Sequence, residues 1–313
     1  MTPVLEANDL TVRYPTKDGT VYALSGVSLQ LFPGETLAVV GESGCGKSTL
    51  GKALMRLIAS RGSIKIHSEE VSTLSNAKLL PFRRRVQMVF QDPQGSLNPR
   101  QRVGTSIARP LQVAGWQRRD IARRVEALLE QVGLPAESAS RYPHEFSGGQ
   151  RQRIGIARAL ATEPDVVICD EPVSALDVSV RAQVINLMRD IQQRMNVAYL
   201  FISHDLSVVE YLADRVMVMY LGRVVESGPT AALWQHPAHP YTAALLAAAP
   251  VADPRQPQAQ ALLEGEVPGP LSLPQGCAFH TRCPRAQARC RQLRPELIPF
   301  TADRQVACHF PLD

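Results

Sequence analysis

The sequence predicts an α/β fold built around a phosphate-binding loop. Gly41–Thr49 reads GESGCGKST, which matches the pattern G-x-x-x-x-G-K-[ST] of such loops. The apolar run Thr36–Val40 precedes this loop as a buried strand would, and Val166–Cys169 and Ala198–Ile202 predict two more buried strands. Apolar residues at helical spacing follow the loop, namely Leu50, Ala53, Leu54, Leu57 and Ile58. A strand and a helix on either side make a chance glycine turn a poor interpretation of the loop.

The residue types of the loop match phosphate chemistry. Gly41, Gly44 and Gly46 can adopt backbone angles that other residues avoid, and they let the chain approach a ligand closely. The loop N–H groups and the N-terminus of the following helix then face the phosphate. Lys47 would reach the β and γ phosphates, and Ser48 would hold Mg²⁺.

Length, charge and cysteine content limit the class of protein. The 313 residues suffice for one large domain or for a core domain with an extension, and the net charge is +5. This mild basicity fits work beside a membrane or a nucleic acid and selects neither. No stretch approaches the roughly 20 apolar residues of a membrane helix, and the N-terminus lacks the features of a secretory signal. We therefore expect a cytoplasmic chain whose six cysteines form no structural disulfides.

Residues 3–32 alternate between apolar and polar positions and are interrupted by turn residues, which predicts an antiparallel β layer before the phosphate loop. Tyr14 lies near the end of the first run. From position alone it is either a core or turn tyrosine or an aromatic that stacks on a nucleobase.

Polar residues follow three predicted strands. Gln91 follows Val86–Phe90, Asp170 and Glu171 follow the second buried strand, and His204 follows the third. Ligands of open α/β sheets bind at the carboxyl ends of the strands. Asp170 and Glu171 match the Walker B arrangement, in which the first acid binds Mg²⁺ and the second polarises the attacking water. Gln91 is either a surface glutamine or a residue facing the phosphates.

The region 100–145 reads as mostly helical, with an amphipathic helix around 121–132. Ser147 suits the start of a helix that runs toward Pro164, and the glycines beside it form either an anion site or a turn. Asp177 can start another helix. The segments 215–220 and 222–226 predict a hairpin.

The composition changes near residue 233. A motif at 236–242 precedes a short Ala/Leu-rich helix, and residues 250–275 resemble a linker. Four cysteines with the spacing C-x5-C-x6-C-x17-C then follow, at positions Cys277, Cys283, Cys290 and Cys308. This is not the usual zinc spacing, so an iron–sulfur cluster, a zinc ion and free thiols all remain possible.

Taken together, the motifs resemble the ATP-binding subunits of ABC transporters over nearly the whole chain. The motifs are Walker A at Gly41–Thr49, the Q-loop at Gln91, the signature at Phe146–Gln150, Walker B at Val166–Glu171, the D-loop at Ser174–Asp177 and the switch histidine His204. The resemblance implies a P-loop NTPase core with an N-terminal antiparallel layer, a helical subdomain near 93–163 and a C-terminal extension. We expect the ATP-binding domain at 1–232 and the extension at 233–313.

The resemblance also assigns roles to residues. It implies catalytic roles for Glu171, His204, Lys47 and Gln91, and adenine stacking for Tyr14. It implies Mg²⁺ ligation by Ser48, Gln91 and Asp170. The implied nucleotide contacts come from Tyr14, Gly41, Glu42, Ser43, Gly44, Cys45, Gly46, Lys47, Ser48, Thr49, Ser147, Gly148, Gly149, Gln150 and Asp177.

A narrower resemblance is to the oligopeptide, dipeptide and nickel importers. It rests on Gln91–Arg100, on His236–Thr242 and on the tail ending Val306–His309. It implies a [4Fe-4S] cluster on the four tail cysteines, as in some members. The form Ser96–Arg100 is more like the second ATPase of a pair.

This resemblance implies ATP hydrolysis, with Mg²⁺, that powers import of a small substrate, with peptides as the first expectation and nickel or another solute as alternatives. The implied partners are a second ATPase subunit in a heterodimer, two membrane permeases and, indirectly, an extracytoplasmic binding protein, with no nucleic acid. The subunit would lie at the cytoplasmic face of the membrane. The rival interpretations are a soluble ABC-type ATPase acting on DNA or ribosomes and a metal- or redox-sensing interaction protein. The single cassette argues against the first and the complete catalytic set against the second.

Overall fold

The computed structural model describes residues 1–248, 268–269, 271 and 273–313, which form two compact units. The first unit contains residues 1–6, 30–35 and 64–202, and the second contains residues 7–29, 36–63 and 203–313. No helix in the described part of the chain is long and apolar enough to cross a membrane.

An antiparallel N-terminal sheet has the strand order β2-β1-β4-β5. Its strands are β1 (Leu5–Thr16), β2 (Gly19–Leu31), β4 (Arg61–Ile66) and β5 (Glu69–Glu70). Of the predicted turn residues, Asp18 lies in the turn between β1 and β2, Pro15 lies near the end of β1, and Gly19 begins β2. The predicted antiparallel layer is therefore confirmed, and the apolar residues of its strands point to the core because strand side chains alternate between faces.

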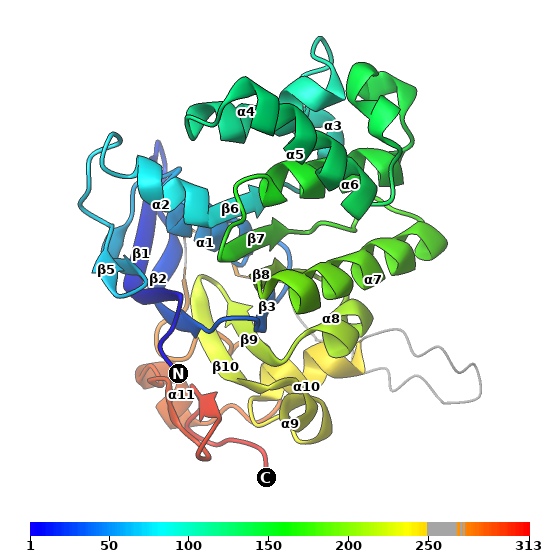
Figure 1. Ribbon diagram of the computed structural model, residues 1–313. Coiled ribbons are helices and arrows are strands. Elements are labelled where there is room, and N and C mark those ends of the chain that lie inside the picture. Colours follow the sequence, from blue (N-terminus) through cyan, green and yellow to red (C-terminus); the bar gives the residue numbers. More distant parts are fainter. Residues whose placement is uncertain (249–267, 270, 272) are drawn as a thin grey trace. The chain divides into compact units, whose positions relative to one another are not determined.

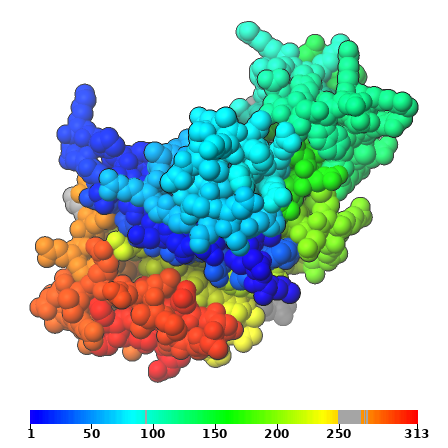
Figure 2. Space-filling view, turned by 60° about the vertical axis from the view of Figure 1, so that its left-hand side comes forward, coloured from blue at the N-terminus to red at the C-terminus, as the bar shows by residue number. Residues whose placement is uncertain are grey.

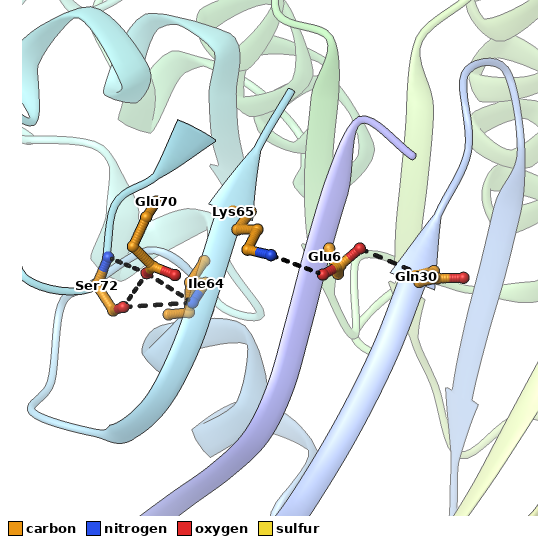
Figure 3. A network of polar contacts seen from close by, with 6 residues as sticks. All are labelled: Glu6, Gln30, Ile64, Lys65, Glu70 and Ser72. Atoms are coloured by element: carbon orange, nitrogen blue, oxygen red, sulfur yellow. Dashed lines mark hydrogen bonds and ion pairs between the residues drawn. The ribbon is translucent and has the colours of Figure 1, made fainter. Parts of the chain in front are cut away.

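Polar side chains connect neighbouring strands of this sheet within the first unit (Figure 3). Lys65 Nζ lies 3.6 Å from Glu6 Oε1, and Gln30 Nε2 donates to Glu6 Oε2 at 3.3 Å. Glu70 Oε1 accepts from Ile64 N at 3.2 Å and from the backbone and side chain of Ser72. The Glu70 carboxylate thus satisfies one backbone donor within β4 and one just after β5.

Three parallel strands lie in the first unit: β6 (Val86–Val89), β7 (Val166–Asp170) and β8 (Ala198–Ile202). β7 pairs with both neighbours, β6 and β8. Every residue of β7 and β8 is buried, as expected for parallel strands covered on both faces. The carboxyl ends of these strands therefore lie at one edge of the sheet.

Helices make up most of the rest of the first unit (Figure 1). They are α2 (Leu80–Arg85), α3 (Pro93–Ser96), α4 (Val103–Val113), α5 (Arg118–Gln131), α6 (Gly148–Leu160) and α7 (Val178–Met195), with 3₁₀ turns at Ala136–Ser140 and Pro143–Glu145. The amphipathic helix expected near 121–132 is α5, which buries Ile121, Val125, Leu128 and Leu129. The basic run Arg83–Arg85 ends α2, a helix that the sequence pattern did not predict.

The second unit contains the strand order β11-β12-β10-β9-β3. β3 (Thr36–Val40) pairs in parallel with β9 (Arg215–Tyr220), and β9 forms the predicted antiparallel hairpin with β10 (Arg223–Pro229). The tail adds two short antiparallel strands, β11 (Ile298–Pro299) and β12 (Gln305–Val306), so that part of the C-terminal extension continues the sheet.

The helices of the second unit are α1 (Lys47–Leu54), α8 (Leu206–Leu212), α9 (Thr230–Gln235), α10 (Pro240–Ala247) and α11 (Ala288–Gln292). The helix after the phosphate loop is shorter than its apolar spacing indicates. Arg56 has a φ of +52°, outside helical geometry, so the expected helical positions Leu57 and Ile58 lie beyond its end. The linker expected at 250–275 lies mostly outside the described residues.

A buried ion pair attaches the tail to β10. Glu226 is fully buried, and its carboxylate accepts from Arg304 Nη2 at 2.8 Å. The same carboxylate accepts from the backbone N–H groups of Ala238 and His239 at 2.8 and 2.9 Å. Burial lowers the pKa of His239 to about 3, so its ring is neutral and Nδ1 accepts from Tyr241 N at the start of α10.

We expect Arg304→Met to lower the free energy of unfolding by about 3–5 kcal/mol, because it leaves the Glu226 charge buried without its partner. Urea unfolding measures this loss. The double variant with Glu226→Gln should be more stable than Arg304→Met alone, and Arg291→Met, at an exposed position of the same tail, is the control. Equal stabilities of Arg304→Met and Arg291→Met would contradict the assigned contribution of the pair.

Candidate functional site: a nucleotide-binding loop and the ends of the sheet

The phosphate loop connects β3 to α1 in the second unit, as the sequence predicts. At two of its positions, both the backbone conformation and the lack of room for a side chain require glycine. Gly41 has a φ of +150°, and a Cβ there would lie 2.2 Å from Met219 O. Gly46 has a φ of +104°, and a Cβ there would lie 2.3 Å from Ala23 O. The loop is therefore pressed against neighbouring backbone, where only glycine fits.

Lys47, the first residue of α1, has a buried side chain that turns back over the loop. Its Nζ donates to Gly41 O at 2.7 Å and to Glu42 O at 3.0 Å. The loop carbonyls thus hold a positive charge in place at the N-terminus of a helix, where an anion is favoured. Burial raises the pKa of the nearby Cys45 thiol, which is consequently a packed, protonated group.

His204 follows β8 and is exposed. Hydrogen bonds within the second unit fix the residues on either side of it. Ser203 N donates to Val39 O at 3.2 Å, and Asp205 N donates to Ser203 Oγ at 3.0 Å. Asp205 also accepts from Ser207 N and Val208 N at the start of α8. The switch histidine expected from the sequence therefore lies on a short segment held at both ends.

Gln91 and Glu171 contact each other in the first unit. Gln91 Nε2 donates to Glu171 Oε2 at 2.9 Å. Gln91 follows β6 and Glu171 follows β7, so the parallel pairing of these strands brings the two side chains to the same edge. Glu171 has a φ of +46°, an unusual conformation for a non-glycine residue, and its N–H donates to Ile202 O at 2.9 Å. Asp170 is buried at the end of β7.

Ser147 begins α6 in a reciprocal cap. Gln150 N donates to Ser147 Oγ at 3.3 Å, and Ser147 N donates to Gln150 Oε1 at 3.0 Å. The predicted helix start at Ser147 is confirmed, and Ser147, Gly148 and Gln150 are exposed. Gly149 is buried, and a Cβ there would lie 2.3 Å from Val180 Cγ1.

Two further candidates lie where the sequence places them. Asp177 begins α7, with Oδ1 accepting from Val180 N at 2.9 Å, so the predicted helix start is confirmed. Tyr14 lies in β1 with its ring partly exposed. Tyr14 is therefore exposed enough to contact a ligand.

Comparison with known proteins identifies the family. Residues 24–174 match the family described as "ABC transporter". The chain is 51% identical to the di/tripeptide transport ATP-binding protein DppF of Pseudomonas aeruginosa, over 99% of this chain and 98% of that one. It belongs to the ATP-binding subunits of ABC transporters. It is also 48% identical to the oligopeptide transport ATP-binding protein AppF of Bacillus subtilis, over 98% of this chain and 97% of that one.

A solved structure and a match to a second family support the same family assignment of this ABC ATPase. The ATP-binding cassette of a dimeric post-hydrolysis complex with ADP and phosphate is 26% identical with a TM-score of 0.66, covering 72% of this chain and 98% of that one. Residues 225–290 match the family described as "Oligopeptide/dipeptide transporter, C-terminal region". The subunit therefore belongs to the oligopeptide/dipeptide subfamily, and the expected P-loop fold of an ABC transporter ATPase is confirmed.

The four tail cysteines of this subunit line one small cavity, together with His280 and His309. Burial, and the neighbouring sulfurs, raise the pKa of Cys277 to about 11, so its thiol is protonated at neutral pH. In the part of the chain that the structure describes, no three such side chains are arranged closely enough to hold a metal ion. Cysteine thiolates are ligands of both zinc and iron–sulfur clusters. Binding of such a group here would require the thiols to lose protons and draw together.

Sequence reasoning missed two residues that contact the phosphate loop of the ABC ATPase. Tyr241 Oη accepts from Glu42 N at 2.9 Å, and the Arg282 guanidinium donates to the Glu42 carboxylate at 2.7 and 2.9 Å. Tyr241 lies in the motif at 236–242, and Arg282 lies between the first two tail cysteines. No sequence pattern connected either segment to the phosphate loop.

Proposed function

We propose that the subunit binds ATP with Mg²⁺ through the residues assigned from its motifs. Gly41–Thr49 would surround the phosphates, with Lys47 as the cation on the β and γ phosphates and Ser48, Asp170 and Gln91 as Mg²⁺ ligands. Tyr14 would stack on adenine. The buried, loop-held Lys47 and the space restrictions at Gly41 and Gly46 support this assignment.

We propose that Glu171 orients and activates the attacking water, with Gln91 and His204 as further catalytic residues. Mg²⁺ would supply charge neutralisation of the phosphates, while the protein supplies positioning. The hydrogen bond between Gln91 Nε2 and Glu171 Oε2 supports a role for Gln91 in orienting the carboxylate. The unusual backbone conformation at Glu171 is typical of functional positions.

We propose that hydrolysis requires a second ATPase subunit in a heterodimer. Ser147, Gly148, Gly149 and Gln150 would contact the nucleotide of the partner, with Asp177 beside the same interface. The exposure of Ser147 and Gln150 at the capped start of α6 supports this role. The domain organisation belongs to the same proposal, with an ATP-binding domain at 1–232, its helical subdomain near 93–163, and the extension at 233–313.

We propose that the cargo is a di- or oligopeptide and that the subunit works at the cytoplasmic face of the membrane with two permeases and an extracytoplasmic binding protein. The observation that carries this proposal is the match along nearly the full chain to peptide transport ATP-binding proteins, which includes the extension.

We propose that Cys277, Cys283, Cys290 and Cys308 hold a thiolate-bound group, with a [4Fe-4S] cluster as the first candidate and zinc as the second. Their common cavity supports the donor set. Iron, sulfide and zinc analysis of the anaerobically purified chain distinguishes a cluster, a zinc ion and free thiols.

Affinity purification of the tagged subunit from detergent-solubilised membranes, followed by mass spectrometry, tests the transporter proposal. We expect two permeases and a second ATPase to co-purify, because a transporter ATPase acts through these partners. A tagged Glu171→Gln form with ATP should retain the second ATPase more strongly. Recovery of the chain alone, or with nucleic acid, would reject the importer assignment.

A further inference from the structure

The C-terminal extension of the subunit contacts the phosphate loop at Glu42. Arg282 Nη1 donates to Glu42 Oε2 at 2.7 Å, and Arg282 Nη2 donates to Glu42 Oε1 at 2.9 Å. Tyr241 Oη accepts from the Glu42 backbone N–H at 2.9 Å. Both residues lie beyond β10 and are 240 and 199 positions away from Glu42. The extension therefore contacts both the side chain and the backbone of the second loop residue.

The same loop residue also supports Lys47. Lys47 Nζ donates to Glu42 O at 3.0 Å, in addition to its bond to Gly41 O. The N–H, the carbonyl and the carboxylate of Glu42 are thus bound by Tyr241, Lys47 and Arg282, respectively. A shift of Glu42 would move an acceptor of the lysine that we assign to the phosphates.

The Arg282–Glu42 pair is well fixed. The Arg282 side chain is only 5% exposed, and the contact is bidentate, the strongest arrangement of arginine with a carboxylate. Three aromatic rings, Tyr220, Tyr241 and Phe279, pack together beside it with centroid distances of 4.7–5.4 Å. Arg282 Nη1 also donates to Tyr220 Oη at 3.4 Å. Burial of the guanidinium strengthens the ion pair.

A tight turn in the cysteine tail places Arg282. His280 N donates to Cys277 O and Arg282 N donates to Phe279 O, both at 3.0 Å, and Cys283 follows directly. Figure 2 shows the segment beyond residue 273 as a continuous orange and red surface of the second unit. The position of the guanidinium thus depends on the local fold of the tail between the first two cysteines.

We infer that Arg282 and Tyr241 are positioning residues of the nucleotide site, through which the C-terminal extension holds the phosphate loop in its ATP-binding conformation. This inference rests on the proposed role of Gly41–Thr49. It goes beyond that role because it makes ATP affinity depend on the structure of the cysteine tail. Arg282 neutralises the Glu42 carboxylate, and an unpaired carboxylate in the loop would repel the triphosphate.

Titration of the full-length chain with a fluorescent ATP analogue tests the inference, with ATPase KM and kcat measured in parallel on its complex with the proposed second ATPase subunit. We expect Arg282→Met to weaken analogue binding and raise KM by about tenfold, with a smaller change in kcat, because a charge-assisted contact is lost and a negative charge is left in the loop. The double variant Glu42→Gln/Arg282→Met should recover most of the affinity, since it removes the unpaired charge. Arg289→Met, at an exposed position of α11, is the matched control.

Recovery of ATP affinity in the Glu42→Gln/Arg282→Met variant distinguishes two roles of the ion pair. It separates a role in positioning the phosphate loop from a role that only attaches the tail. If the pair only attached the tail, Arg282→Met would lower Tm and leave the affinity of the folded protein unchanged, and that result would overturn the inference. Arg282→Lys and Tyr241→Phe provide milder changes if Arg282→Met does not fold. Tyr241→Phe keeps the ring packing and removes the Oη acceptor, so we expect weaker binding in the same direction.

Lys47→Ala in the same titration distinguishes failure of this inference from failure of the proposed function. Unchanged affinity in Lys47→Ala would reject the phosphate-loop assignment and the inference together. Loss of affinity in Lys47→Ala with wild-type affinity in Arg282→Met and Tyr241→Phe would reject the inference alone.

Discussion

Glu171→Gln is expected to bind ATP with near wild-type affinity and to lose at least about 100-fold in ATPase activity, which is the usual contribution of a general base. The amide has the shape of the carboxylate, and its oxygen can still accept the hydrogen bond from Gln91 Nε2. It cannot take a proton from water. The variant should therefore retain the architecture and lose the chemical step.

Steady-state ATPase assays and analogue titration measure the two halves of this prediction. In the presence of ATP and the proposed partner ATPase, size-exclusion chromatography should show an accumulated dimer. Glu126→Gln, an exposed glutamate on α5, is the control and should behave like the wild type. Retained turnover in Glu171→Gln would reject Glu171 as the catalytic base.

The contact between Gln91 and Glu171 shows which parts of a site can be predicted from sequence. Each residue follows an apolar, β-branched run, and such runs predict buried parallel strands. The sequence places each residue after a strand, but it leaves Gln91 open between a surface glutamine and a residue facing the phosphates. The parallel pairing of β6 with β7 brings Gln91 to Glu171. The helix starts at Ser147 and Asp177 were predictable because capping is a local interaction.

The contacts around Glu42 could not be predicted in this way. Arg282 lies in a tail without helical or strand periodicity, and it pairs with a residue 240 positions earlier. An arginine on its own gives no signal that its partner is a loop glutamate, because most arginines are solvated. The end of α1 was also mispredicted, since the apolar side chains of Leu57 and Ile58 continue a helical spacing after the backbone has left the helix at Arg56. Local propensity and apolar spacing therefore predicted helices and strands. The contact between the C-terminal extension and the phosphate loop depends instead on tertiary packing.

Lys47→Ala is expected to weaken ATP binding by about 10- to 150-fold, which corresponds to the roughly 1.5–3 kcal/mol of a hydrogen bond to a charged group. Lys47 carries its charge into the loop, where Gly41 O and Glu42 O already hold the ammonium group. A lysine that is buried and held before ligand arrives loses little conformational freedom on binding, so its removal should appear almost entirely as lost affinity.

Fluorescent nucleotide titration measures the effect, and thermal unfolding in the absence of nucleotide shows whether the loop has merely unfolded. Lys52→Ala is the matched control, because Lys52 lies on the same helix α1 with its side chain exposed to solvent. Its substitution removes an equal charge from the same helix and leaves the loop unchanged. It therefore separates the contact of Lys47 with phosphate from the overall electrostatic field of the protein. Equal affinities of the Lys47→Ala and Lys52→Ala variants would show that the loop does not bind phosphate through Lys47. A loss of affinity in Lys47→Ala but not in Lys52→Ala would show that the Lys47 charge acts on the triphosphate from its fixed position in the loop.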